Sequence, residues 1–147
     1  MDPLSVTVAA VSLVAGIRTL LVSVNDFARK VRDAQSDIDL VKNELESVQY
    51  TLKFLTDNDL IVPQALTVQF SGIITQTRGI VDQIKTSIDE QSAARISRRI
   101  RWVVSGREDM EKLRSSLEQH KSALNLAVDC LALYVSTPCL LNLRTSL

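Results

Sequence analysis

The sequence predicts an all-α protein, an antiparallel helical bundle of four long helices plus one short basic helix. The chain of 147 residues holds only four glycines, and aromatic residues make up 4% of it, a composition that favours helix over sheet. Apolar residues recur at spacings of three and four along four separate stretches, which is the helical period. Because each stretch carries one apolar stripe and the connections are short, the stripes are expected to pack together in a bundle.

The first helix is expected to run from Pro3 to about Ala34. Asp2 is a favourable N-cap residue, and Pro3 suits the first helical position, where its missing N–H costs nothing. Its expected core stripe consists of Val6, Ala10, Leu13, Ile17, Leu20, Val24, Phe27 and Val31.

The second helix is expected to begin at a capping box, Ser36-Asp37-Ile38-Asp39, in which the serine hydroxyl would satisfy a free backbone N–H. It is expected to end in the turn-rich stretch 56–59. Its expected core stripe consists of Ile38, Val41, Leu45, Val48, Leu52 and Leu55.

The third helix is expected to begin near Pro63, which suits a first helical turn. Its expected stripe consists of Leu66, Phe70, Ile73, Thr77, Ile80, Ile84 and Ile88, with Val81 alongside. Gly72 and Gly79 lie seven residues apart and therefore on similar faces of this helix. They either permit a close contact with another helix or are simply tolerated at a cost of about 1 kcal/mol each.

The short basic helix is expected in the stretch "SAARISRRIRWVVSGRE". A second capping box, residues 105–108, then opens the last helix, which Thr137-Pro138 ends. The expected stripe of this helix consists of Met110, Leu113, Leu117, His120, Leu124, Ala127, Leu131 and Tyr134. Residues 1–137 are thus expected to form one domain, and residues 138–147 a C-terminal tail.

Catalytic and cofactor-binding patterns are absent from the sequence. The single histidine, His120, falls in a core stripe, and no nucleophile elbow, zinc motif or phosphate-binding loop is present. The two cysteines, Cys130 and Cys139, do not form a metal-binding pattern and are expected to be free thiols. We therefore expect no enzyme activity, no cofactor, no metal and no small-molecule substrate.

The opening stretch "MDPLSVTVAAVSLVAGIRTLLVSV" is compatible with a signal peptide, a membrane span or a bundle helix. A signal peptide needs early positive charge, whereas the only early charge here is Asp2. A permanent span is disfavoured by Arg18, because an arginine at the bilayer centre costs roughly 2.5–3.5 kcal/mol. We expect a buried bundle helix that remains apolar enough to enter a bilayer once something exposes it.

The arginine cluster, defined as Arg95, Arg98, Arg99 and Arg101, is the one strong charge asymmetry in a chain of zero net charge. It is either a solvated face whose aliphatic stems cover apolar surface, or a contact with anionic lipid, in which Trp102 would lie at the membrane interface. Nucleic acid is disfavoured because the cluster is local and no stacking aromatic residues interleave it.

Three stretches together resemble the HeLo-like N-terminal domains of fungal STAND (NLR-like) receptors. They are "MDPLSVTVAAVSLV", "SDIDLVKNELESVQYTL" and "RIRWVVSGREDMEKLRSSLEQHKSALNLAVDCL", and the resemblance extends over about residues 1–136. The group is related to HeLo domains and is often compared with the four-helix bundle of the mixed-lineage-kinase-like necroptosis executor.

The resemblance implies a cytoplasmic domain for programmed cell death or innate immunity. Its N-terminal helix would engage or permeabilise the plasma membrane after oligomerisation, with anionic lipids and other copies of the chain as partners. The membrane-active residues would be Leu4, Val8, Val11, Leu13, Ile17, Leu20 and Leu21. The arginine cluster would contact lipid headgroups. The alternative is a non-enzymatic oligomerisation or adaptor module of a STAND-type receptor.

Overall fold

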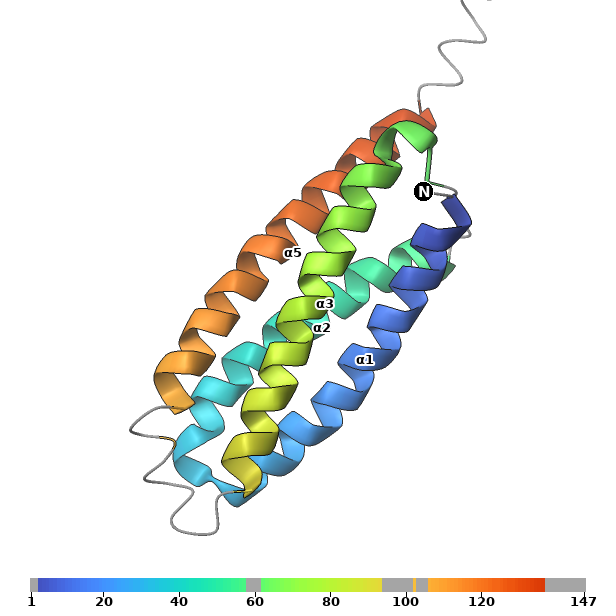
Figure 1. The fold of residues 1–147 in the computed structure, drawn as a ribbon. Coiled ribbons are helices and arrows are strands. Elements are labelled where there is room, and N and C mark those ends of the chain that lie inside the picture. Colours follow the sequence, from blue (N-terminus) through green and yellow to red (C-terminus); the bar gives the residue numbers. More distant parts are fainter. Residues whose placement is uncertain (1–2, 58–61, 94–101, 103–105, 137–147) are drawn as a thin grey trace, which may run out of the picture.

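The computed structural model describes residues 3–57, 62–93, 102 and 106–136. Its long helices are α1 (Pro3–Lys30), α2 (Gln35–Asp57), α3 (Gln64–Ala93) and α5 (Arg107–Ser136), and the described residues include no strand (Figure 1). The predicted all-α helical bundle is therefore confirmed. The expected short basic helix falls on residues 94–101 and 103–105, which lie outside the described residues, as does the expected tail.

The four helices form a square in which α1 and α5 each pack against both α2 and α3. Helices α1 and α2 are antiparallel, as are α3 and α5, but the consecutive helices α2 and α3 lie at diagonally opposite corners of the square (Figure 1). As a result, α1 runs parallel to α3, and α2 runs parallel to α5. The mixture of directions is a feature that the short connections did not predict.

The stripes predicted for the first two helices form one half of the core, and residues of α3 and α5 form the other. Every predicted stripe residue of these helices is buried: Val6, Ala10, Leu13, Ile17, Leu20, Val24, Phe27 and Val31 near or in α1, and Ile38, Val41, Leu45, Val48, Leu52 and Leu55 in α2. At about 25 cal/mol for each Å² of apolar surface removed from water, this burial is the main stabilising contribution.

The buried face of α3 differs slightly from the prediction. Ile74 is buried, whereas the predicted Ile73 is half-buried. Thr67 and Thr77 are also buried, and their hydroxyls donate to the carbonyl oxygens of Pro63 and Ile73 at 3.1 and 2.7 Å. A hydrogen bond to the carbonyl four residues earlier satisfies each hydroxyl locally, so a threonine can occupy the core.

The connection between α1 and α2 is tighter than expected. Helix α1 ends at Lys30, Val31 is extended (φ −126°, ψ 91°), and a 3₁₀ turn, η1 (Arg32–Ala34), leads into α2. Because α2 begins at Gln35, Ser36 already lies in its first turn, and the prediction of Ser36 as the N-cap was wrong. Val31 and Ala34 are buried and anchor the turn to the core. The second predicted cap, Ser105, lies outside the described residues.

Trp102 closes the end of the bundle where α1 and α3 finish and α5 begins. Its side chain is fully buried, and its ring lies 5.4 Å from the ring of Phe27, centroid to centroid. Gly106 packs directly against it: a Cβ atom at Gly106 would lie 2.7 Å from the Trp102 ring and 3.0 Å from the Gln91 amide carbon. This cluster of Trp102, Phe27, Gln91 and Gly106 is called the end plug below.

Gly106→Ala is expected to lower the free energy of unfolding by about 1–3 kcal/mol, because the added methyl overpacks the end plug. Gly79→Ala is the matched control, since no atom lies within 4 Å of a Cβ built there. It is expected to raise stability by about 0.5–1 kcal/mol through helix propensity. Urea unfolding followed by circular dichroism measures both, and shifts of the same sign would contradict the packing of the end plug.

The surroundings of Gly72 and Gly79 also decide between the two interpretations of these residues. Both are exposed, and neither would bring a Cβ within 4 Å of another part of the protein. They do not mediate a close helix contact within the described structure.

Candidate functional site

The residues predicted to be membrane-active divide between the core and the surface. Leu13, Ile17 and Leu20 are fully buried in the bundle, and Leu21 is half-buried against its core. Val8 and Val11 are exposed, at 69% and 53% of their surface. The side chain of Leu4 lies outside what the structure describes. Among the side chains of this set that the structure describes, Val8 and Val11 are the most accessible to a membrane while the bundle stays closed.

The outward face of α1 is almost without charge. From Pro3 to Asn25 the only charged residue is Arg18, and it is exposed. The other exposed residues of this stretch are Ser5, Val8, Val11, Ala15, Thr19 and Val22. Residues 3–24 of a helix extend roughly 33 Å at 1.5 Å per residue, which is close to the thickness of a bilayer's hydrocarbon core.

Helix α3 continues this surface beside α1. Its first 18 residues, 64–81, include Arg78 as their only charged residue, and Val68 among them is 78% exposed. Because α3 packs parallel to α1, the two uncharged stretches lie side by side and start at the same end (Figure 1). Residues 3–24 of α1 and 64–81 of α3 are called the uncharged face below.

The contribution of α3 to this face was not predicted from the sequence. A signal was present, because no charged residue occurs from Leu60 to Thr77. The pairing of this stretch with α1, however, depends on the diagonal placement of α2 and α3.

A shallow depression of about 400 Å³ lies between α1 and α3 on the uncharged face. Ser5, Val8 and Ala9 line it, together with Ser12 and Arg78. Arg78 donates a hydrogen bond to the Ser12 hydroxyl at 2.6 Å, which joins the two helices. Neither Arg78 nor Arg18 forms an ion pair with a carboxylate of the described part of the chain. Both guanidinium groups remain available to external anions.

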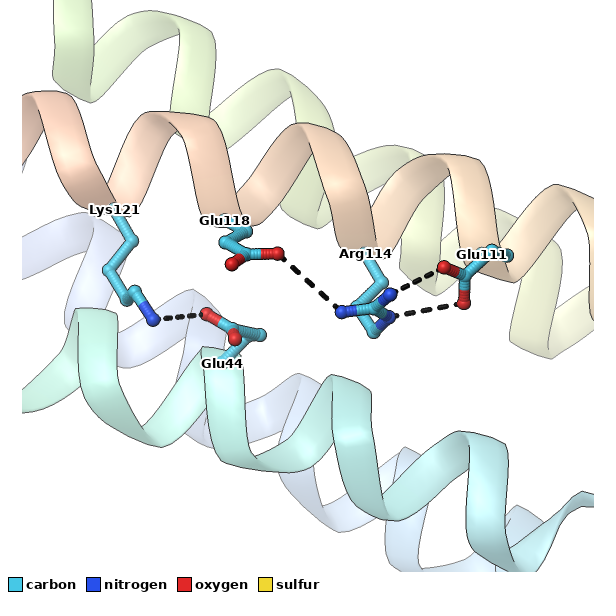
Figure 2. A network of polar contacts seen from close by, with 5 residues as sticks. All are labelled: Glu44, Glu111, Arg114, Glu118 and Lys121. Atoms are coloured by element: carbon cyan, nitrogen blue, oxygen red, sulfur yellow. Dashed lines mark hydrogen bonds and ion pairs between the residues drawn. The ribbon is translucent and has the colours of Figure 1, made fainter.

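The opposite side of the bundle, formed by α2 and α5, is strongly charged (Figure 2). Lys121 Nζ of α5 lies 2.8 Å from Glu44 Oε2 of α2. Arg114 donates hydrogen bonds to both carboxylate oxygens of Glu111 and lies 3.6 Å from Glu118. The hydrogen bond from Arg114 lowers the pKa of the Glu111 carboxyl. The two sides of the bundle therefore differ sharply in charge.

The arginine cluster lies outside the described residues, but its neighbour Trp102 does not. One of the two interpretations of the cluster would have placed Trp102 at a membrane interface, but its ring is fully buried in the end plug. An aromatic ring at a water–lipid boundary needs one exposed edge, and Trp102 offers none.

His120 of α5 contacts α3 through Gln76. It is half-buried, with Nδ1 2.7 Å from the Ser116 carbonyl oxygen and Nε2 3.2 Å from Gln76 Oε1. Within the described residues, no group of three or more histidine, cysteine or acidic side chains could hold a metal ion. Cys130 is a half-buried free thiol, whereas Cys139 lies outside the described residues.

One described helical stretch, Ser5–Lys30, is long and apolar enough to cross a membrane, although a core helix of a soluble protein passes the same test. The chain matches no protein-family model, no curated protein and no solved structure. The likeness to HeLo-like domains thus rests on the three stretches of sequence that carry it.

Proposed function

We propose that this chain is a non-enzymatic helical bundle that associates with anionic membranes, in the manner of a HeLo-like cell-death or immune-signalling domain. The observation that carries the proposal is the uncharged face, on which two parallel helices expose valines and two arginines that form no ion pair with a described carboxylate, and which contains no carboxylate of its own. The transfer of apolar side chains from water into the membrane interface lowers the free energy. Arginines at the interface attract the phosphates of the lipid headgroups.

Association is expected to proceed in two steps. Val8 and Val11 are already exposed, so a first contact needs no change in the bundle. Deeper insertion requires α1 to leave the bundle and transfer Leu13, Ile17 and Leu20 from the core to lipid. Self-association favours this step, because clustering raises the local concentration of released helices and adds their weak affinities. The protein is accordingly cytoplasmic until it is induced to bind the plasma membrane.

Val8→Glu combined with Val11→Glu is expected to reduce leakage of anionic vesicles by about tenfold or more, because burying a carboxylate in lipid costs several kcal/mol. Dye release is measured after forced oligomerisation of the full chain on phosphatidylcholine–phosphatidylserine vesicles. Leu126→Glu is the matched control, since Leu126 is 61% exposed and belongs to α5, which contributes no residue to the uncharged face. This variant is expected to leave leakage unchanged.

Two results would overturn the proposal. One is that forced oligomers of the unaltered chain neither bind nor permeabilise anionic vesicles. The other is an equal loss of leakage in the control, which would show that any added surface carboxylate has the same effect.

A protein-interaction module is the second candidate function, and exposed apolar side chains on the charged side favour it. Tyr50 of α2 and Leu126 of α5 are 78% and 61% exposed. Sedimentation of the chain without lipid distinguishes the candidates. Self-association that Leu126→Glu abolishes and Val8→Glu preserves would support this second function.

A further inference from the structure

The connection between α1 and α2 forms a second concave site, at the end of the bundle that Trp102 closes. Its volume is about 470 Å³. Its lining includes Arg29, Arg32 and Lys42, the amide side chains of Asn25 and Gln35, and one carboxylate, Asp39. We call it the turn site. Three cations and two amides converge here around a single acid.

The fold holds these side chains in place from three consecutive elements. Asn25 and Arg29 lie four residues apart and therefore share a face of α1. Gln35, Asp39 and Lys42 share a face of α2 by the same helical spacing. Between them, buried Val31 and Ala34 fix the 3₁₀ turn, which leaves Arg32 exposed. The core therefore fixes the backbone of the turn, and the side chains that line the concavity extend from it to the surface.

The positive charge of the turn site is not neutralised by its neighbours. Arg29, Arg32 and Lys42 form no ion pair with any carboxylate that the structure describes. Other cations close by are paired: Lys30 with Asp26 and Arg107 with Asp37, each at 3.0 Å. The fold thus pairs the cations around the turn site and leaves the three inside it free.

We propose that the turn site binds a phosphate group, carried either by a soluble small molecule or by a lipid headgroup. A phosphate monoester carries about −1.5 to −2 charges at neutral pH and offers three acceptor oxygens, which matches three cations offset by one carboxylate. Guanidinium groups bind phosphate oxygens in pairs, and an ammonium group adds a point charge. The site is separate from the uncharged face, and phosphate binding does not depend on the proposed membrane function.

The test is a titration of the ¹⁵N-labelled full chain with sodium phosphate and sodium pyrophosphate at constant ionic strength. Saturable chemical-shift changes confined to residues 25–42 are expected. Arg32→Gln combined with Lys42→Gln is expected to raise the Kd for pyrophosphate by about tenfold, because hydrogen bonds to charged groups are lost. Both residues have solvent-accessible side chains, so the folded core is unaffected. Lys53→Gln, on an exposed part of α2, is the control and is expected to retain the original Kd.

A second arm of the experiment identifies the source of the phosphate. Flotation with phosphatidylcholine vesicles, with and without phosphatidic acid, is compared for the same variants. Binding of pyrophosphate in solution supports a soluble ligand. Binding only to phosphatidic acid vesicles, lost with Arg32→Gln and Lys42→Gln but kept with Lys53→Gln, supports a headgroup. Binding in neither arm, or equal weakening by the control, would overturn the proposal. Vesicle leakage by the Val8→Glu and Val11→Glu variants is measured in a separate experiment. The phosphate-binding proposal and the membrane proposal can therefore be overturned independently.

Discussion

Trp102→Ala is expected to lower the free energy of unfolding by about 3–5 kcal/mol, the usual cost of removing a large buried aromatic side chain. The side chain is fully buried, its ring packs against that of Phe27, and Gly106 lies directly against it. Since a single domain is typically stable by 5–15 kcal/mol, the variant loses a large share of its total stability.

Denaturant unfolding of the unaltered chain can be followed through Trp102 itself, because it is the only tryptophan. Circular dichroism is used for the variants. Tyr50→Ala, at a residue 78% exposed, is the control and is expected to change stability by no more than about 0.5 kcal/mol. Similar losses in the two variants would show that the end plug does not form in solution.

Trp102→Phe separates the size of the side chain from its polar atom. Trp102 Nε1 and Gln91 Oε1 are buried, and neither has a hydrogen-bond partner among the described residues. An unpaired buried donor is costly, so removing the indole N–H offsets part of the packing loss. Phenylalanine at this position is therefore expected to cost less than alanine by more than its size alone predicts.

The sequence was sufficient to predict which face of α1 and α2 is buried. Helical periodicity shows which residues share one face of a helix. Every residue of the apolar stripes predicted for these two helices is buried. Periodicity does not show against which other helix a buried face packs. The parallel pairing of α1 with α3 follows from the diagonal placement of α2 and α3, and the uncharged face could not be assembled without it.

The burial of Trp102 could not be predicted from the sequence, for a similar reason. In sequence, Trp102 follows a run of arginines, and its neighbours are compatible with a membrane interface. In the structure, Trp102 packs against Phe27, 75 residues earlier in the numbering, and against Gly106, which also lies close to Gln91. The three cations of the turn site were likewise separate residues in the sequence, and the tight 3₁₀ turn brings them together.

Ile17→Glu is expected to unfold the domain at 25 °C, whereas Val8→Glu is expected to leave it folded. Both residues belong to α1, but Ile17 is 0% exposed and Val8 is 69% exposed. A glutamate at position 17 would be buried without a cationic partner, because all its neighbours in the stripe are apolar. Burial of an unpaired charge costs several kcal/mol in addition to the lost apolar packing, which together are comparable to the whole stability of a domain.

Thermal unfolding followed by circular dichroism compares the two variants with the unaltered chain. The Val8→Glu variant is expected to keep its midpoint within a few degrees, since surface substitutions usually change stability by less than about 0.5 kcal/mol. The Ile17→Glu variant is expected to show no cooperative transition. If it melted like the unaltered chain, α1 would not be held in the core, and release from the bundle would not be a step in membrane association.

The same comparison decides which variants can test membrane activity. A loss of vesicle leakage in Ile17→Glu or Leu13→Glu would follow from unfolding alone, because both side chains belong to the core. Loss of leakage in Val8→Glu or Val11→Glu, with the melting curve unchanged, can only arise at the surface. The residues that pack α1 into the bundle are different from those that would first contact lipid. This difference in exposure along one helix makes the membrane hypothesis testable.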